Sequence, residues 1–155
     1  MTASIARERP DSPDARALIA ELDAELEVLY ARENRHGFSV EQLIADGVAF
    51  FVARDDGTPV ACGGVKIYSG DYGEIKRMFV RPGFRGRGLS RLMLEHLVKH
   101  VRDEGLAVVR LETGIHQAAA IRLYESSGFA RRAAFGEYVD DAVSLFYERG
   151  VDADS

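Results

Sequence analysis

The stretch VRPGFRGRGLSRLMLEHL, which runs from Val80 to Leu97, carries the strongest signal for the fold. It follows an apolar run typical of a β-strand, and it ends in the apolar periodicity of a helix. Between the two lie Pro82, three glycines and four arginines. A helix N-terminus offers backbone N–H groups without intrahelical partners and the positive end of the helix dipole, and glycines let a ligand approach them. The stretch therefore predicts a strand–loop–helix unit that binds an anion such as phosphate.

The distribution of charge supports this interpretation. The chain has a net charge of −5, yet no acidic residue interrupts the segment from Lys76 to Arg91. The acidic balance argues against a nucleic-acid partner, since general nucleic-acid binding usually accompanies a basic surface. No Walker loop or dinucleotide fingerprint is present, which disfavours a nucleotide-binding protein of another class. A glycine-rich turn with solvated arginines is the alternative left open.

The length and composition fit one globular domain. We expect a single domain over residues 1–155, with a core at about 14–149, a lead-in at 1–12 that forms a short strand or a loose end, and a tail at 150–155. Cys62 is the only cysteine, so we expect neither an internal disulfide nor a bound metal. The first residues lack the apolar core of a secretion signal, and no apolar run reaches the ~18 residues of a membrane span. The expected location is therefore the cytoplasm, with no membrane partner.

Apolar periodicity and turn signals predict the order of the elements. Helices are expected at 14–32, after the N-cap Ser39, at about 88–104 and within 116–128. Strands are expected within 48–68, with a hairpin at Asp56-Gly57, and at 72–80, 106–113, 129–134 and 142–149. This order predicts an α/β fold with a mixed sheet, in which an antiparallel meander precedes βαβα units and a C-terminal hairpin. The predicted buried stripes are Leu18, Leu22, Leu26 and Leu29 on the first helix and Leu89, Leu92, Met93, Leu97 and Val101 on the helix after the loop.

Two motifs in register resemble those of the GCN5-related N-acetyltransferases, the GNAT family. The first is Arg85-Gly86-Arg87-Gly88-Leu89-Ser90, which matches the acetyl-CoA signature except that Ser90 stands where Gly or Ala is usual. The second is LETGIHQAAAIRLYESSGF, in which Gln117 replaces the usual Asn and Tyr124 precedes the closing Gly-Phe. The resemblance runs from about Val48 to Glu148 and implies a GNAT fold that binds acetyl-CoA.

The resemblance also implies roles for individual residues. The backbone from Met78 to Val80 would bind the pantetheine arm, with the N–H of Met78 placed to polarise the thioester carbonyl. Tyr124 would give a proton to the leaving thiolate, and the alternative is a tyrosine packed on the sheet. The residues expected to bind the cofactor are Met78, Phe79, Val80, Arg85, Gly86, Arg87, Gly88, Leu89, Ser90, Gln117 and Tyr124.

An attacking amine must be neutral, so the reaction needs a base. Glu74 is the first candidate, because even spacing in an unbroken strand places it on the same face as Met78, and Glu112 is a weaker one. A bulge would upset this parity, and a solvated Glu74 paired with Lys76 or Arg77 is the alternative.

By the same resemblance, the acceptor enters between residues 33–38 and 135–141. The acids of the second segment would favour a cationic amine or simply be solvated. His116, near the start of the second motif's helix, would touch the cofactor or the acceptor.

The function implied is transfer of an acetyl group from acetyl-CoA to a primary amine, on a small molecule or a peptide, by direct attack in a ternary complex. The alternative is a catalytically silent GNAT-fold module that binds or senses acyl-CoA. A homodimer is expected only by analogy with the family.

Overall fold

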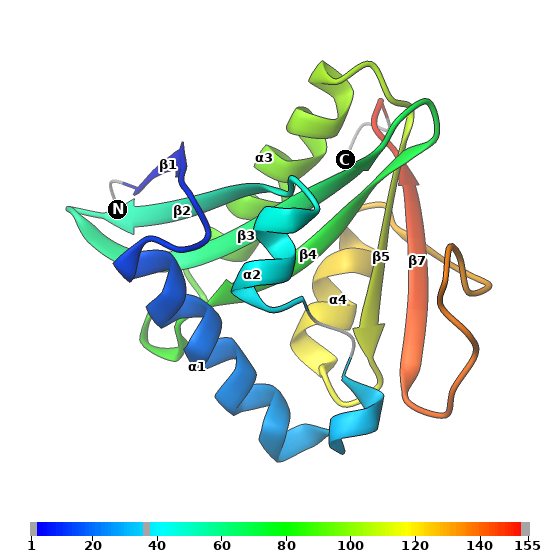
Figure 1. Ribbon diagram of the computed structural model, residues 1–155, viewed down its shortest axis with the longest axis horizontal. Helices are drawn as coiled ribbons and strands as arrows, with labels where there is room; N and C mark the ends of the chain where they lie inside the picture. The colour runs from blue at the N-terminus through cyan, green and yellow to red at the C-terminus, as the bar shows by residue number, and fades with distance from the viewer. Residues whose placement is uncertain (1–2, 36–37, 153–155) are drawn as a thin grey trace.

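The computed structural model describes residues 3–35 and 38–152, and in these residues the chain forms one seven-stranded sheet with four α-helices (Figure 1). The strand order is β1-β2-β3-β4-β5-β7-β6. The strands are β1 (Ala3–Arg7), β2 (Ala49–Asp55), β3 (Thr58–Tyr68), β4 (Tyr72–Val80), β5 (Val108–Gly114), β6 (Ala130–Arg132) and β7 (Ser144–Gly150). The helices are α1 (Pro13–Leu29), α2 (Val40–Ala45), α3 (Leu89–Asp103) and α4 (Ala118–Ser126), and 3₁₀ turns occupy Arg32–Asn34 and Pro82–Phe84. The predicted mixed α/β fold is confirmed.

Local signals placed several elements correctly. Asp56 and Gly57 both have positive φ, 49° and 82°, as a tight two-residue hairpin turn between β2 and β3 requires. The hydroxyl of Ser39 accepts a hydrogen bond from the N–H of Gln42 at 3.1 Å and thereby caps α2. Of the two expectations for the lead-in, the strand is correct, because β1 pairs with β2 along its length.

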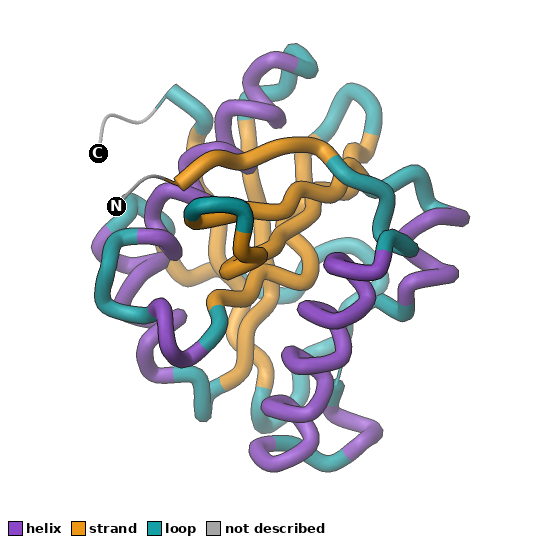
Figure 2. The backbone as a smooth tube through the Cα atoms, turned by 90° about the vertical axis from the view of Figure 1, so that its left-hand side faces the viewer, coloured by secondary structure: helices purple, strands orange, loops and turns teal. Residues whose placement is uncertain are grey.

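Helices cover both faces of the sheet (Figures 1 and 2). α1 and α2 pack on one face, where Leu18, Leu22 and Leu43 meet Phe50 and Phe79. α3 and α4 pack on the other, in a larger core. Two predicted stripe positions were wrong: Leu29 is 37% exposed and Leu92 is 45% exposed. Ile19 on α1 and Leu94 and Val98 on α3 are buried instead.

α1 ends three residues earlier than the periodicity predicted. Tyr30 has extended backbone at φ −135°, and its ring is buried. Its hydroxyl accepts a hydrogen bond from the N–H of His116 at 3.0 Å, beside Gly114 at the end of β5. A contact between segments far apart in the sequence therefore ends this helix, and helix propensity does not decide where it stops.

The sheet divides at the centre. β4 and β5 are parallel, and their register pairs only Gly73 with Val109 and Glu74 with Arg110. Beyond Glu74 the two strands separate, which leaves the last half of β4 and the end of β5 without a shared ladder. The two central strands therefore splay apart beyond Glu74.

β4 also contains a bulge. Its register with β3 shifts between Cys62 and Gly64, and Arg77 has a left-handed φ of 58°.

Within the described residues, no helix combines the length and the apolar character needed to span a bilayer.

Candidate active site

A groove of about 590 Å³ lies between α1, the end of β4, the glycine-rich loop and the start of α4. We call it the outer groove. Eight of the predicted cofactor residues line it: Met78, Phe79, Val80, Arg85, Gly86, Ser90, Gln117 and Tyr124. Gly88 and Leu89 line an adjoining hollow between the loop and α4. Arg87 lines neither space; it lies over the ring of Phe84 and 4.0 Å from a carboxylate oxygen of Asp55.

Two glycines of the loop have left-handed backbone. Gly86 and Gly88 have φ values of 80° and 78°, a conformation that costs any other residue about 1–2 kcal/mol. A Cβ built on either glycine would meet no atom within 4 Å, so the backbone faces open space. Gly88 is the N-cap of α3 and supplies no side-chain cap, which leaves the first N–H groups of the helix available to a ligand. These features fit a pyrophosphate.

The arginines of this region are less free than the sequence suggested. Arg81 binds Glu21 of α1 through Nε and Nη2, the latter at 2.7 Å, and Arg85 binds Glu25 at 2.8 Å. Arg77 binds Asp23 of the same helix. Much of the positive charge therefore attaches α1 to β4 and the loop, and backbone N–H groups remain the main candidates for binding an anion.

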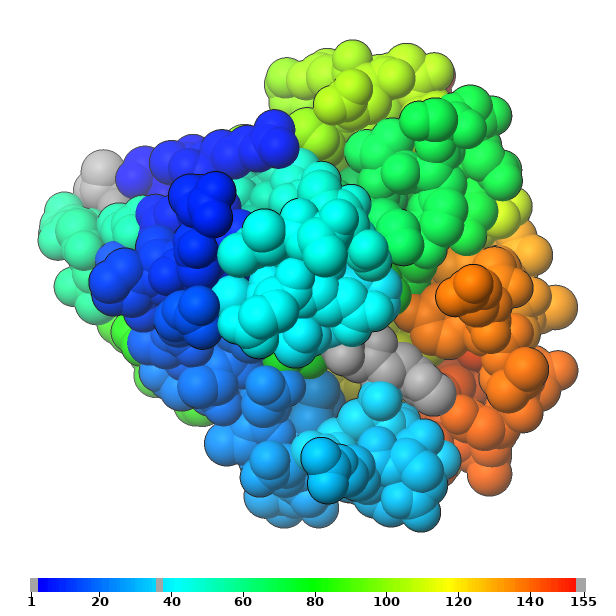
Figure 3. All heavy atoms as spheres, in the orientation of Figure 1, coloured from blue at the N-terminus to red at the C-terminus, as the bar shows by residue number. Residues whose placement is uncertain are grey.

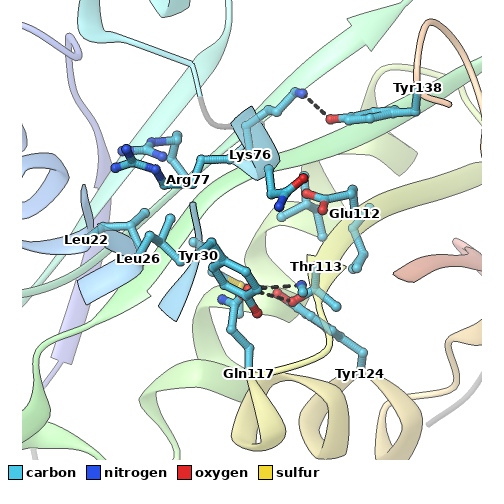
Figure 4. A pocket seen from close by; sticks show the side chains of 16 residues that line it. Leu22, Leu26, Tyr30, Lys76, Arg77, Glu112, Thr113, Gln117, Tyr124 and Tyr138 are labelled. Atoms are coloured by element: carbon cyan, nitrogen blue, oxygen red, sulfur yellow. Dashed lines mark hydrogen bonds between the residues drawn. The ribbon is translucent and has the colours of Figure 1, made fainter. Parts of the chain in front are cut away.

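A second space, which we call the inner cleft, lies where β4 and β5 separate and has a volume of about 90 Å³. Its floor is apolar, with Leu22, Leu26 and Ile75. Its polar lining, much of it labelled in Figure 4, consists of Tyr30, Asn34, Arg35, Lys76, Arg77, Glu112, Thr113, Gln117, Tyr124 and Tyr138.

Four residues line both spaces: Leu22, Met78, Gln117 and Tyr124. Tyr124 is 6% exposed, and burial, followed by the charge of Glu112, raises the pKa of its hydroxyl above the ordinary value. The hydroxyl therefore stays protonated at any working pH. Gln117 accepts hydrogen bonds through its side-chain oxygen from the N–H of Gly114 at 3.0 Å and from the Thr113 hydroxyl at 3.3 Å.

Glu74 lies outside the lining of both spaces. It is 1% exposed, 2.9 Å from the ammonium of Lys76, and accepts a hydrogen bond of 2.6 Å from the Tyr138 hydroxyl. The solvated Glu74 that the sequence left open is wrong, although Lys76 is its partner. The shared face with Met78 is also wrong, because the bulge at Arg77 reverses the alternation: Met78 packs into the α3/α4 core, whereas Lys76 lies 4.1 Å from the ring of Phe38 on the opposite face.

Glu112, the weaker base candidate, does line the inner cleft. It lies on β5 two residues before Gly114, and its charge contributes to raising the pKa of Tyr30, Tyr124 and Tyr138. Its carboxylate is thus close to the hydroxyls that surround the cleft.

The two segments expected to admit the acceptor are both represented at the inner cleft. From 33–38, Asn34 and Arg35 line it, while His36 and Gly37 lie outside the described residues. From 135–141, Tyr138 lines it. α1, α2 and the β6–β7 loop, which are distant in sequence, gather on one face of the molecule (Figure 3).

The acids of the β6–β7 loop do not reach the cleft. Glu137 and Asp140 are exposed, and Asp141 accepts hydrogen bonds from the N–H groups of Val143 and Ser144. His116 lines the outer groove and its ring lies 5.4 Å from that of Tyr30. Sequence reasoning missed Tyr30, which belongs to neither motif and to neither acceptor segment, and it placed Arg35 and Tyr138 in those segments without giving either a role of its own.

Comparison with known proteins decides the family. The profile described as the acetyltransferase (GNAT) family matches residues 13–129. The chain belongs to the GNAT family. A relative named IAA acetyltransferase, from Azospirillum brasilense, is 44% identical over 147 residues, which cover 94% of this chain and 96% of that protein. The chain is therefore an acyltransferase that uses acetyl-CoA as acetyl donor, as the two motifs led us to expect.

Solved structures agree with this assignment. A crystal structure described as an acyl-CoA N-acyltransferase, from Klebsiella pneumoniae, has a TM-score of 0.83 and 33% identity, and the match covers 97% of this chain and 98% of that one. The PaiA N-acetyltransferase from Thermoplasma acidophilum, in complex with coenzyme A, has a TM-score of 0.75 at 18% identity over 97% of this chain and 99% of that one. The second match shows the shared fold alone.

Proposed function

We propose that this GNAT enzyme transfers the acetyl group to a primary amine by direct attack, with acetyl-CoA in the outer groove and the amine in the inner cleft. The observation that supports this most directly is the meeting of the two spaces at Leu22, Met78, Gln117 and Tyr124. A thioester held in one space and an amine held in the other would come together there. The C–N bond forms, the C–S bond breaks, and the thiolate takes up a proton.

Residues of the loop and of β4 hold the donor. Backbone N–H groups from Gly86 to Ser90 bind the pyrophosphate, and the backbone of Met78, Phe79 and Val80 binds the pantetheine arm. Arg85 adds charge at the edge of the groove, where its side chain is about half exposed. The N–H of Met78 stabilises the negative charge that develops on the thioester oxygen.

Tyr124 is the proton donor to the thiolate. Its side chain lies where the spaces meet, and its raised pKa keeps the hydroxyl protonated. A thiol with a pKa of ~8.5 leaves readily even without help, so this contribution is modest.

Glu112 is a better candidate than Glu74 for the group that takes the proton of the attacking amine. Glu112 lines the inner cleft, whereas Glu74 is buried and bonded to Lys76 and Tyr138. Glu74 then positions the side chains of Lys76 and Tyr138.

The test is the release of free thiol from acetyl-CoA in the presence of candidate amines, with hydrolysis in the absence of amine as the blank. The panel contains amino acids, polyamines, aminoglycosides and peptides with free N-termini. IAA is tested beside this panel and not as one of its amines, because one relative is named IAA acetyltransferase. Turnover with one class of amine supports the proposal. Binding of coenzyme A by calorimetry without turnover on any member would favour the silent binding module instead.

A further inference from the structure

The lining of the inner cleft is rich in positive charge. Arg35, Lys76 and Arg77 line it, and among the described lining residues Glu112 is the only acid. Lys76 is neutralised by its contact with Glu74 at 2.9 Å. The charges of Arg35 and Arg77 are opposed by α1 acids that are mostly exposed: Glu27, at 3.6 Å from Arg35, is 64% exposed, and Asp23, the partner of Arg77, is 53% exposed.

Both arginines have a donor that is left unused. The Nε–H groups of Arg35 and Arg77 are buried and have no hydrogen-bond partner within the described part of the protein. Guanidinium groups remain protonated at all relevant pH values, so these are permanent donors. Burying a donor without a partner is unfavourable. Both unused donors belong to residues that line the inner cleft, so we infer that a ligand bound there engages these two guanidinium groups.

We propose that the acceptor is a small amine that also carries a carboxylate, and that Arg35 and Arg77 bind this carboxylate in the inner cleft. This inference rests on the proposed function. A planar guanidinium matches the geometry of a carboxylate and forms strong, charge-assisted hydrogen bonds with it. An amine with no anionic group would meet only like charge at this end of the cleft.

The remaining lining indicates the rest of the acceptor. Leu22 and Leu26 lie beside Arg77 (Figure 4), and Ile75 completes an apolar floor. The cleft volume of about 90 Å³ is below the ~150 Å³ of an engineered cavity that holds benzene. The acceptor is therefore of amino-acid size, with an apolar side chain.

The experiment compares amino acids with their carboxamides. L-alanine, L-valine and L-leucine are each paired with the corresponding amide, and both thiol release from acetyl-CoA and calorimetric binding to the coenzyme A complex are measured. The amine of an amide is less basic than that of the acid, so basicity alone favours the amide. The variants are Arg35→Gln and Arg77→Lys. Arg77→Lys keeps the positive charge but removes the Nε–H donor. Arg32→Gln is the control. Arg32 begins the 3₁₀ turn that Arg35 ends, but it is exposed and lines neither space.

We expect the wild-type enzyme to prefer acids over amides by roughly 10- to 100-fold, the factor that a charge-assisted hydrogen bond typically contributes. Arg35→Gln and Arg77→Lys should bring this ratio close to one, and Arg32→Gln should leave it unchanged. Should Arg77→Lys fail to fold, Arg35→Gln decides. Equal or weaker binding of the acids, no saturable binding of any acid, or an unchanged ratio in the variants overturns the inference. Binding of acids without thiol release from any amine would contradict the proposed function and leave the carboxylate site supported.

Discussion

Replacement of Tyr124 by phenylalanine removes one hydroxyl from the place where the outer groove and the inner cleft meet. The ring itself should stay in position. It is 6% exposed and its centroid lies 5.8 Å from that of Phe129 and 6.2 Å from that of Tyr147, contacts that phenylalanine can retain. We therefore expect a change in the free energy of unfolding of no more than about 1 kcal/mol.

The expected effect on turnover follows from the role of the hydroxyl. General acid catalysis contributes about 10²–10⁴-fold in typical enzymes, but a thiolate with a pKa of ~8.5 needs less assistance than an alkoxide. The loss is then close to one hydrogen bond to a charged group, about 1.5–3 kcal/mol, which corresponds to roughly a 10- to 100-fold decrease in kcat. Because burial raises the pKa of Tyr124, the wild-type profile should show no decline from ionisation of this group between pH 7 and its ordinary value of 10.0.

The assay measures kcat by thiol release and the Kd of coenzyme A by calorimetry. Tyr147→Phe is the matched control: Tyr147 is fully buried, and its hydroxyl binds Glu125 at 2.8 Å, away from both spaces. We expect a lower kcat with an unchanged Kd for Tyr124→Phe, and an unchanged kcat for the control. A kcat within twofold of wild type would refute the reasoning and leave Tyr124 as a packing residue.

Four further predictions follow from the same geometry. Gly86→Glu should raise the Kd of coenzyme A at least 100-fold, since it adds bulk and negative charge at the loop. Gly105→Glu is the control and should not raise the Kd, because Gly105 has a similar φ of 81° and equally open surroundings but lies at the far end of α3. Equal effects of both substitutions would contradict the loop assignment. Glu112→Gln should lower kcat/KM most at low pH, where the amine is mainly protonated, and a larger, pH-selective effect of Glu74→Gln would restore Glu74 as the base. Gly114→Ala should destabilise the fold by about 1–3 kcal/mol, because its Cβ would lie 1.9 Å from the Tyr30 hydroxyl oxygen, and Gly83→Ala, whose Cβ meets nothing within 4 Å, serves as the control in thermal melts. Burial lowers the pKa of His96 and His100 below the ordinary 6.5, so the folded state binds fewer protons than the unfolded state. The free energy of unfolding should therefore fall as the pH drops below 6.5. The double variant His96→Gln/His100→Gln should flatten this pH dependence in urea titrations, and an unchanged dependence would assign it to other groups.

The features that the sequence predicted well are those controlled by nearby residues. A turn at Asp56-Gly57 needs two residues that tolerate positive φ, and a helix start at Ser39 needs one side-chain oxygen. The glycines of the loop likewise act through their own backbone. Each of these features is determined by residues within a few positions, so the local sequence alone was sufficient to predict it.

The features that escaped prediction depend on contacts between distant segments. The sequence predicts Glu74 as a surface carboxylate, but in the structure Lys76 and Tyr138 enclose it, and Tyr138 is 64 residues away. The arginines around the loop read as an anion site, yet Glu21 and Glu25 bind two of them from a helix 60 residues earlier. Charge is visible in a sequence, but the partner that neutralises it is not.

The bulge in β4 connects the two halves of the site. Gly64 pairs with Lys76 and Cys62 pairs with Phe79, so Gly63 faces both Arg77 and Met78. This extra residue lets Lys76 and Arg77 line the inner cleft together, while Met78 both lines the cleft and packs against the opposite core. A left-handed φ of 58° costs a residue such as arginine about 1–2 kcal/mol, so the surroundings must impose it. Asp23 of α1 holds the guanidinium of Arg77. Gly63, opposite the bulge, lets α3 pack closely on the sheet, because a Cβ there would lie 2.9 Å from Leu97 Cδ1. Contact with α1 thus helps to hold the bulge, and the bulge places cationic side chains beside the end of the strand that we propose binds the donor.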